Sequence, residues 1–410
     1  MPIPTTPGTR PKPARTSASA RRRLTVRTRN AGTEPDAASL RGTRRRDLLA
    51  WYDRERRPLP WRERPSAYGI WVSEIMLQQT TVATVMTRWR SFVARFPDQA
   101  ALAAAPLEDV LAAWSGLGYY RRARALHEAA REVMRAGGDL PRDAAGWRAL
   151  PGVGPYTAGA VASMAYGQRA AAVDTNVSRV LRRLHCRDAG AADALTAAAL
   201  ARLADELVDP ERPGDWNQAL MDLGAAVCTP AAPDCGACPL ADGCRARRGG
   251  DPAAVAGRRT GPATTAVVLS LLVVRSGRGL VAVPPGETNG IRCAGLAAPV
   301  RDGFAGLHAG LWGLPSTSWY PLAGPAPLAA FAAAWGGALG TGAPPPEHRG
   351  AVRHAITRYR LRAEVFSTTV GRGWVPPAPW VRCGPTRLAA IPWSSLAHKA
   401  LRRAGVSIEI

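Results

Sequence analysis

Apolar residues recur at three- and four-residue intervals along the first half of the chain, a spacing typical of helices that bury one face. From about residue 38 to 246 this pattern predicts an all-α region, with Gly or Pro between the periodic segments. No alternating strand pattern occurs there. The clearest helical segments are 70–96, 107–136, 155–166 and 193–208.

The pattern changes after a Gly/Pro/Arg/Thr-rich stretch at 247–263, which we interpret as a linker. The run AVVLSLLVV from Ala266 is rich in Val and Leu, as buried strands are, and AVRHAITRYRLRAEVF (351–366) is expected to form another strand. The sequence therefore predicts a multidomain protein. An all-α domain at 47–246 is followed by a mixed α/β domain at 264–410.

Composition and charge point to a folded protein with a polyanionic partner. Hydrophobic residues make up 46% of the 410 residues and charged residues 21%, which permits a packed core and excludes global disorder. The 54 Lys and Arg against 31 Asp and Glu give a net charge of +23. This excess indicates a nucleic acid or an anionic membrane surface as partner.

The first 46 residues carry twelve Lys or Arg and two acids, so +13 of the +23 lies on the rest of the chain. We interpret residues 1–46 as a disordered basic tail that adds salt-sensitive affinity for DNA. A transit peptide is the alternative, although several prolines interrupt any amphipathic helix. No apolar run approaches the roughly 20 residues that span a bilayer, and no signal-peptide core is present, so an integral membrane protein is not expected.

Four of the seven cysteines are bunched with the spacing C-x6-C-x2-C-x5-C: Cys228, Cys235, Cys238 and Cys244. Nothing suggests secretion, so we expect a metal rather than disulfides. Zinc sites usually contain two C-x2-C pairs, whereas one pair with a ligand on either side fits a [4Fe–4S] cluster better. After a helical domain, this spacing resembles the cluster loop of the endonuclease III superfamily of DNA base-excision glycosylases.

The segment ALPGVGPYTAGAVASMAYG (149–167) predicts a helix end, a Gly-x-Gly turn and a new helix that begins at Pro155. Gly152 and Gly154 allow the backbone to approach a phosphate closely, and the helix N-terminus adds its positive dipole end. This is the pattern of a helix-hairpin-helix DNA-binding motif. By itself it is moderately specific, and a plain helix–turn–helix packing element is the alternative.

Two acidic residues stand in apolar surroundings. Glu74 lies within AYGIWVSEIMLQQTTV and is either on a solvated helix face or a carboxyl whose raised pKa suits a general acid. Asp174 follows the run AAAV and is either a plain helix N-cap or a second functional carboxylate. Cleavage of an N-glycosidic bond needs such a pair, because one acid protonates the leaving base and one carboxylate stabilises the oxocarbenium sugar.

Lysine occurs only at Lys12 and Lys399. A bifunctional glycosylase-lyase uses a lysine amine to form a Schiff base. The hairpin position that carries this lysine in endonuclease III-type lyases is Tyr156 here. A monofunctional glycosylase is therefore favoured.

With these motifs the chain resembles the MutY family of adenine DNA glycosylases over roughly 46–246. The matching segments are LPWRERPSAYGIWVSEIMLQQT, WSGLGYYRRARALH, LPGVGPYTAGA, AVDTNVSRVLRRL, NQALMDLGAAVC and the four cysteines. The resemblance implies a hydrolase that removes adenine mispaired with 8-oxoguanine or guanine in double-stranded DNA. It also implies a monomer in the bacterial cytoplasm, at the nucleoid.

The resemblance assigns roles to individual residues. Glu74 would protonate adenine N7 and later activate water, and Asp174 would stabilise the transition state with help from Tyr156 and Asn176. Gln79 and Tyr120 would wedge into the duplex beside the extruded base, at a cost of a few kcal/mol for flipping. The adenine pocket and its DNA-binding neighbours would comprise Arg57, Trp61, Arg62, Gln218, Gln78 and Thr80.

The second domain resembles, less specifically, the Nudix-like domain with which this family reads 8-oxoguanine. GLHAGLWGLPSTSW resembles its Gly-Leu-Trp-x-x-Pro stretch, but no acid-rich Nudix box follows, so Mg²⁺-dependent pyrophosphate hydrolysis is not expected. The family's Phe-Ser-His reading loop would be Ile356-Thr357-Arg358. Two alternatives stay open: a related glycosylase for another mismatch or damaged pyrimidine, and a non-catalytic iron–sulfur DNA-binding protein.

Overall fold

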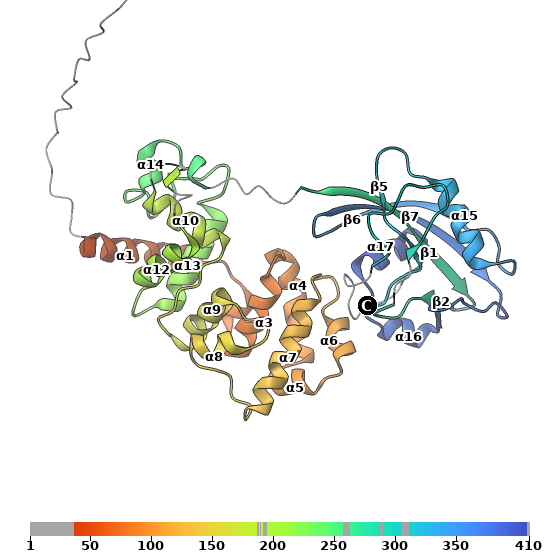
Figure 1. Cartoon of the computed structure of the whole chain (residues 1–410). Coiled ribbons are helices and arrows are strands. Elements are labelled where there is room, and N and C mark those ends of the chain that lie inside the picture. The colour runs from red at the N-terminus through yellow and green to blue at the C-terminus, as the bar shows by residue number, and fades with distance from the viewer. Residues whose placement is uncertain are drawn as a thin grey trace, which may run out of the picture.

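The computed structural model describes residues 37–407, apart from 187, 189, 192–194, 257–262, 288–289 and 305–310. A helical domain is followed by a domain built around a β-sheet, and the chain joins them through 257–262, which lie outside the described residues (Figure 1). The expected order of an all-α domain before a mixed α/β domain is confirmed.

The first domain consists of helices throughout its described residues. They are α1 (Ala37–Glu55), α2 (Pro60–Glu63), α3 (Ala67–Leu77), α4 (Val82–Arg95), α5 (Gln99–Ala104), α6 (Leu107–Ala113), α7 (Arg121–Arg135), α8 (Ala144–Ala149), α9 (Pro155–Tyr166), α10 (Thr175–His185), α12 (Ala197–Leu207), α13 (Pro213–Ala226) and α14 (Arg245–Gly249).

Helix α3 forms the centre of this domain, because nearly all of its residues are buried. Trp71 and Met76 are fully inaccessible to solvent and pack in one core with α4, α7 and α9. A second core joins α1, α10, α12 and α13, with Leu48 and Leu220 among its buried residues. A helix that is apolar all round must lie inside a domain, so the one acidic residue of α3 is enclosed.

The single periodic segment expected at 70–96 is two helices. Helix α3 ends at Leu77, and α4 begins after Thr81, whose hydroxyl accepts from the backbone N–H of Thr84. The apolar spacing continues across this break, which is why periodicity alone did not reveal it. The turn at 78–81 connects the buried helix α3 to the amphipathic helix α4 and carries Gln79.

Two expected boundaries differ from the structure. Helix α1 begins at Ala37, inside the segment expected to be a tail up to residue 46, and its later turns bury Leu48 and Tyr52 against the core. The expected linker from 247 is also partly structured. Helix α14 runs to Gly249, and Val255 is buried beside Cys186 and Ala246.

The second domain is a mixed sheet with helices on both faces (Figure 1). Its elements are β1 (Thr265–Ser276), β2 (Gly279–Ala282), β3 (Gly290–Ile291), β4 (Ser316–Thr317), β5 (Tyr320–Pro321), α15 (Leu328–Leu339), β6 (Glu347–Ile356), β7 (Tyr359–Val370), β8 (Val381–Cys383), α16 (Pro385–Ala390) and α17 (Ser395–Arg403). The sheet runs β3-β4-β1-β2-β8, with β5 and β7 also paired to β1 and β6 paired to β7.

Strand β1 is the central strand, which explains its uninterrupted apolar run. Val267 and the apolar residues at every second position after it pack toward α16 and α17. Val268 and the apolar residues that alternate with the first set pack toward α15. A strand buried on both faces needs no polar alternation. The strand expected at 351–366 is instead two antiparallel strands, β6 and β7, paired from Glu347↔Ser367 to Ile356↔Tyr359 around the two-residue turn Thr357-Arg358.

The two domains touch beside the turn that follows α6. The hydroxyl of Tyr120 donates to the carbonyl of Trp393 at 3.3 Å, and Ser115 Oγ lies 3.4 Å from Nε2 of His398. Leu311 of the second domain is buried in the core of the first. The Gly-Leu-Trp-x-x-Pro stretch begins at residue 310, which lies outside the described residues, and its Leu311 takes part in this contact.

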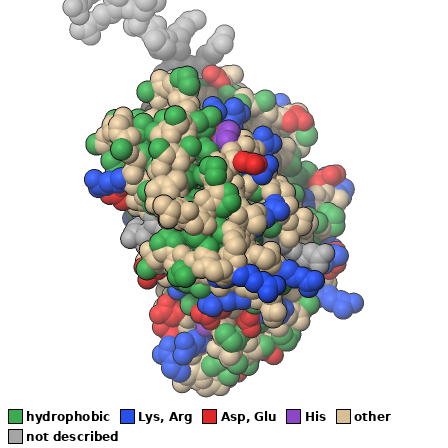
Figure 2. All heavy atoms as spheres, turned by 90° about the vertical axis from the view of Figure 1, so that its right-hand side faces the viewer, with side chains coloured by type: hydrophobic (Ala, Val, Ile, Leu, Met, Phe, Trp, Pro, Cys, Tyr) green, Lys and Arg blue, Asp and Glu red, His purple; other side chains and the backbone are tan. Residues whose placement is uncertain are grey.

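Figure 2 views the second domain from outside and shows Lys and Arg side chains in a band across the lower part of this face, with a few acids among them. None of the described helices combines the length and the apolar character needed to cross a membrane.

Candidate active site

Glu74 lies in the last two turns of α3 and is 3% exposed. The phenol of Tyr156, from the first turn of α9, donates a hydrogen bond to its Oε2 at 2.7 Å. The same hydroxyl lies 3.6 Å from the sulfur of Met221 on α13. Three helices therefore enclose one carboxyl group.

Burial raises the pKa of Glu74 to about 7. The hydrogen bond from Tyr156 lowers it, the charge of Asp174 raises it and the charge of Arg62 lowers it again. The pKa of Tyr156 lies well above its usual value, because of burial first and of the two carboxylates next. Near neutral pH, Glu74 can hold a proton and give it up, as a general acid must.

Asp174 is the N-cap of α10, and its Oδ1 accepts from the backbone N–H of Val177 at 2.7 Å. Its Oδ2 accepts from the side chain of Asn176 at 2.9 Å. The interpretation of Asp174 as a helix N-cap is thus confirmed, and this position does not exclude a role as a second functional carboxylate. Asp174 is close enough to raise the pKa of both Glu74 and Tyr156, so the cap holds a second carboxylate beside the buried acid.

A buried carboxylate organises two arginines next to Glu74. Asp222 on α13 is 1% exposed, with Arg57 Nη2 at 2.6 Å and Arg62 Nη1 at 2.7 Å. Burial by itself would raise the pKa of Asp222, but hydrogen bonds and charge from Arg62 and Arg57 lower it below its usual value. The sequence analysis did not single out Asp222.

Gln218 stands one helical turn before Asp222 on α13, which places both on the same side of the helix. This four-residue spacing from Gln218 is the sequence signal from which Asp222 could have been predicted. Trp61, on α2, is 4% exposed and packs edge-on against Trp89 with ring centroids 5.9 Å apart. Of the expected pocket residues, Arg62 is close enough to Glu74 to lower its pKa, Arg57 shares Asp222 with Arg62, and Trp61 packs in the core.

The glycine turn before α9 has the expected geometry. Gly152 has φ +76°, a left-handed conformation that favours glycine, and a Cβ there would lie 2.6 Å from that of Ala125. Gly154 is the N-cap, and Pro155 occupies the first position of α9. Tyr156 follows at once, so the turn that presents backbone at the surface also positions the phenol against Glu74.

The two turns at 78–81 and 114–120 carry the expected wedge residues, with one correction. Tyr120 is 8% exposed and hydrogen-bonded to Trp393, so it does not project from the turn. Its neighbour Tyr119 is 48% exposed, with φ +48°. Gln79 is exposed, with φ +57°. The projecting aromatic ring is therefore Tyr119, and two adjacent tyrosines in an aperiodic turn gave no signal for choosing between them.

Gln78 and Thr80 flank this tip and point into the protein. The amide of Gln78 lies 3.5 Å from Thr157 Oγ1, and the Thr80 hydroxyl donates to the carbonyl of Leu117 at 3.3 Å. Both side chains support the turn and are not its projecting part.

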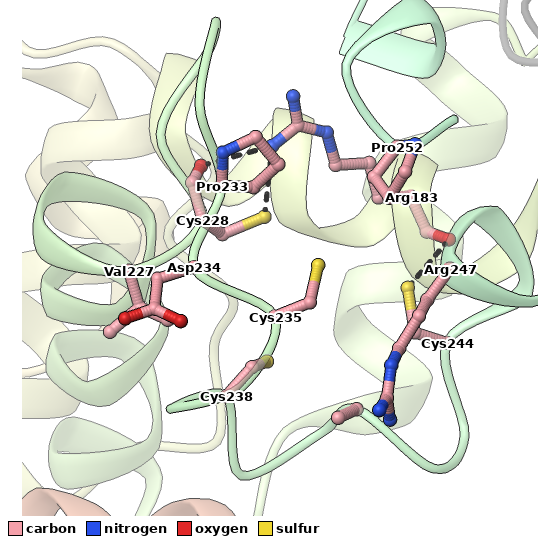
Figure 3. Close-up of a pocket in the computed structure, with 11 residues that line it drawn as sticks. Arg183, Val227, Cys228, Pro233, Asp234, Cys235, Cys238, Cys244, Arg247 and Pro252 are labelled. Atoms are coloured by element: carbon pink, nitrogen blue, oxygen red, sulfur yellow. Dashed lines mark hydrogen bonds between the residues drawn. The ribbon is translucent and has the colours of Figure 1, made fainter. Parts of the chain in front are cut away.

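The four clustered cysteines line one pocket (Figure 3). Arg183 from α10 is 1% exposed and donates to the carbonyl of Thr229 at 2.7 Å and to the sulfur of Cys228 at 3.2 Å. Within the described ranges, no three His, Cys, Asp or Glu side chains are grouped closely enough to hold a single metal ion. The four thiols surround this one pocket (Figure 3).

A chain of hydrogen bonds connects the cysteine loop to Asp174. Arg179 donates to the carbonyl of Cys228 at 2.8 Å and to Oδ1 of Asn176 at 2.9 Å. Asn176 in turn donates to Asp174. The conformation of the cysteine loop therefore influences the position of the Asp174 carboxylate through the side chains of Arg179 and Asn176, both on α10.

In the second domain, Thr357 and Arg358 form the exposed turn between β6 and β7. Thr357 has φ +50°, which is uncommon for a β-branched residue. The guanidinium of Arg358 lies over the ring of Tyr359, 5.2 Å from its centroid. Lys399, on α17, donates to the carbonyl of Arg353 and lies in this second domain, away from Glu74.

Comparison with known proteins matches residues 72–206 to the family described as HhH-GPD superfamily base excision DNA repair protein. The human adenine DNA glycosylase is 42% identical over 68% of this chain and 58% of its own length. The rat adenine DNA glycosylase is 38% identical over 85% of this chain and 75% of its own. That of Mycobacterium tuberculosis is 47% identical over 57% of this chain and 77% of its own. The chain belongs to the adenine DNA glycosylase family of base excision repair proteins.

Proposed function

We propose that the protein is a monofunctional, monomeric glycosylase that hydrolyses the N-glycosidic bond of adenine mispaired with 8-oxoguanine or guanine in duplex DNA. The observation that carries this proposal is the buried Glu74, with a pKa raised to about 7 and a second carboxylate beside it. The 2.7 Å bond from Tyr156 orients its Oε2. One protonated and one ionised carboxyl are what cleavage of an N-glycosidic bond requires.

In this mechanism Glu74 delivers its proton to N7 of the extruded adenine, so that the base leaves as a neutral molecule. Positive charge then develops on the sugar, and Asp174 faces it as a negative group held in place by the α10 cap and Asn176. Glu74, now ionised, accepts a proton from the attacking water. Tyr156 supports that step, because its hydrogen bond stabilises the ionised form of Glu74.

The paired arginines suit recognition of the base. Arg57 and Arg62 are both fixed by Asp222, and the Arg62 side chain is only 13% exposed. A guanidinium has five donors in a rigid plane, so donors not used by Asp222 are available to the ring nitrogens of a purine. Gln218 on the same side of α13 adds an amide that both donates and accepts.

The absence of lysine from residues 13–398 makes the monofunctional part of the proposal testable. The protein should release free adenine and leave an abasic strand that breaks only on treatment with alkali. Borohydride should trap no covalent complex between protein and DNA, because Tyr156 cannot form a Schiff base. Efficient trapping, or strand cleavage without alkali, would refute it.

The cysteine loop fits a [4Fe–4S] cluster held by Cys228, Cys235, Cys238 and Cys244. All four thiols line one pocket, and one C-x2-C pair with a single cysteine on either side fits such a cluster better than zinc. When bound, such a cluster would supply structural rigidity to the loop and no electrons to the reaction. Arg183 and Arg179 hold the loop backbone in position.

For the second domain we propose a non-hydrolytic, Nudix-like role in reading 8-oxoguanine. The exposed turn at Thr357 supports this role, since a non-glycine residue in a left-handed conformation often marks a functional tip. The Thr357 hydroxyl is suited to a base edge, and the permanent charge of Arg358 is better suited to a phosphate. Helix α15, which follows the Gly-Leu-Trp-x-x-Pro stretch, contains no acid for Mg²⁺.

A further inference from the structure

Arg122, on the first turn of α7, is 8% exposed and lies between the turns at 78–81 and 114–120. Its Nη1 donates to carbonyls at the end of α3 and in the first turn, and its Nη2 donates to both turns. The acceptors of Nη1 are the carbonyls of Ile75 (2.9 Å), Met76 (2.7 Å) and Gln78, and those of Nη2 are Thr80 Oγ1 (2.9 Å) and the carbonyls of Leu117 (3.0 Å) and Gly118 (3.1 Å).

This arginine has no carboxylate partner among the described residues. Burial lowers its pKa to about 10. The rings of Trp114 and Tyr119 each lie with their centroids 5.5 Å from its guanidinium carbon. A buried cation that is held only by carbonyls, a hydroxyl and ring faces is costly, and its removal would leave carbonyls of both turns without a donor.

Both turns contain strained backbone at their tips. Gln79 has φ +57° and Tyr119 has φ +48°, and the glycines before Tyr119, Gly116 and Gly118, have φ +88° and +68°. Left-handed conformations of residues other than glycine persist only when the surroundings hold them. Two of the carbonyls bonded by Arg122 belong to the residues directly before these tips, Gln78 and Gly118.

We propose that Arg122 is a positioning residue that locks the two turns together, so that Gln79 and Tyr119 enter the duplex as one rigid wedge. This inference rests on the proposed function, since it concerns how that enzyme extrudes its base. A wedge that is rigid before binding loses less conformational entropy on insertion than two independent turns do. Extrusion of adenine then depends on Arg122, although Arg122 itself touches neither the base nor Glu74.

Lysine cannot replace this arginine. An ammonium has one nitrogen with three donors, whereas the six acceptors around Arg122 are divided between two nitrogens of one plane. The hydroxyl of Thr80 makes a second, weaker link, because it accepts from Arg122 and donates to the carbonyl of Leu117 at 3.3 Å. Arg122→Lys and Thr80→Val therefore weaken the same link to different extents.

The test uses the full chain with Glu74→Gln, which binds without excising, and a duplex with 2-aminopurine opposite 8-oxoguanine. The fluorescence of this adenine analogue rises when it leaves the stack. Fluorescence is read at saturating protein, with saturation established by anisotropy, so that weaker binding cannot mimic weaker extrusion. The matched control is Arg45→Lys, because Arg45 also donates to three backbone carbonyls, at 2.9–3.1 Å, far from the turns.

We expect Glu74→Gln/Arg122→Lys to lose most of the fluorescence rise, Thr80→Val in the same background to lose part of it, and Arg45→Lys to retain it. In the active enzyme, Arg122→Lys should slow single-turnover release of adenine by about tenfold or more. A full rise with Arg122→Lys and Thr80→Val, or an equal loss with Arg45→Lys, overturns the role of Arg122. If Arg122→Lys does not fold, Thr80→Val decides. A Glu74→Gln protein that binds without any rise contradicts the proposed function itself.

Discussion

The phenol of Tyr156 donates a 2.7 Å hydrogen bond to Oε2 of Glu74. The position of Tyr156 follows from the glycine turn that ends at Gly154, two residues before it. The backbone that presents the helix N-terminus of α9 at the surface thus also sets the orientation of the buried acid. In the proposed mechanism, recognition of DNA and delivery of a proton are therefore joined within one short segment.

The pH dependence of the reaction should report the pKa of Glu74. Only the protonated form can donate, and burial raises that pKa to about 7. Single-turnover release of adenine should be constant at lower pH and fall as the pH rises through about 7, approaching tenfold per unit. Glu74→Gln should release no adenine at any pH while it still binds the duplex. A rate that is flat from pH 6 to 9 would contradict this role of Glu74.

The same raised pKa makes Glu74 a source of instability at higher pH. A carboxyl whose folded pKa lies above its unfolded value favours the folded state less as the pH rises between the two values, here 4.5 and about 7. Glu74→Gln should therefore unfold with a similar free energy to wild type near pH 4.5. Above pH 7 it should be more stable, by at most about 3 kcal/mol. Denaturant unfolding at both pH values checks this, and equal stabilities at pH 8 would be contrary to it.

Asp222→Asn should impair excision by removing the negative charge that holds two arginines. Asp222 has 2% of its side chain exposed, so Arg57 and Arg62 would be left with no counter-charge in its place. We expect single-turnover release to slow by roughly ten- to a hundredfold, which corresponds to about 1.4–2.8 kcal/mol. The matched control is Asp53→Asn, whose surface pair with Arg212 is half exposed and should not affect the rate. Equal effects of the two variants would exclude a specific role for Asp222.

The cysteine pocket should contain iron. Purified protein should be brown, with a broad visible absorbance and about four irons per chain. Changing Cys235 or Cys238 to Ser should lower the yield of folded protein or its affinity for DNA more than it slows the bond cleavage. One zinc per chain without iron would show that the cluster assignment is wrong.

Much of the active site was predictable because its chemistry is tied to local sequence. Glu74 interrupts an apolar helix, Asp174 precedes a helix as a cap, and Pro155 after Gly-x-Gly begins another, so each element was recognisable alone. That they meet around one carboxyl needed the resemblance or the fold. Asp222 was missed because an acid on a helix surface looks ordinary until two arginines from residues 57–62 are brought against it.

The remaining differences between the sequence-based predictions and the structure lie in turns. Tyr119 and Tyr120 are adjacent and chemically equal, and only the left-handed backbone at Gly118 and Tyr119 directs one outward and the other into the contact with Trp393. Arg122 was not singled out, because it is one of several arginines in RRARALHEAAREVMR and no sequence pattern distinguishes it. The hairpin at Thr357 lacks the Gly or Asn that usually marks a two-residue turn, so β6 and β7 were expected to be one strand.

Thr357 should contribute to discrimination between 8-oxoguanine and guanine. One good hydrogen-bonded contact is worth about 1–3 kcal/mol, so Thr357→Ala should narrow the preference for adenine opposite 8-oxoguanine over adenine opposite guanine by roughly tenfold or more. Thr357→Ser keeps the hydroxyl and should keep the preference. Arg358→Ala should weaken binding to both duplexes alike and reduce the salt dependence. Full discrimination by Thr357→Ala would assign lesion reading to other residues.

The most direct test of the whole account is single-turnover base release from three duplexes that differ at one central pair: adenine opposite 8-oxoguanine, thymine opposite guanine, and thymine glycol opposite adenine. The full chain should release adenine from the first and no base from the other two, and Glu74→Gln should release none. Release of thymine or thymine glycol by the wild type, with adenine left in place, would contradict an adenine glycosylase built around Glu74.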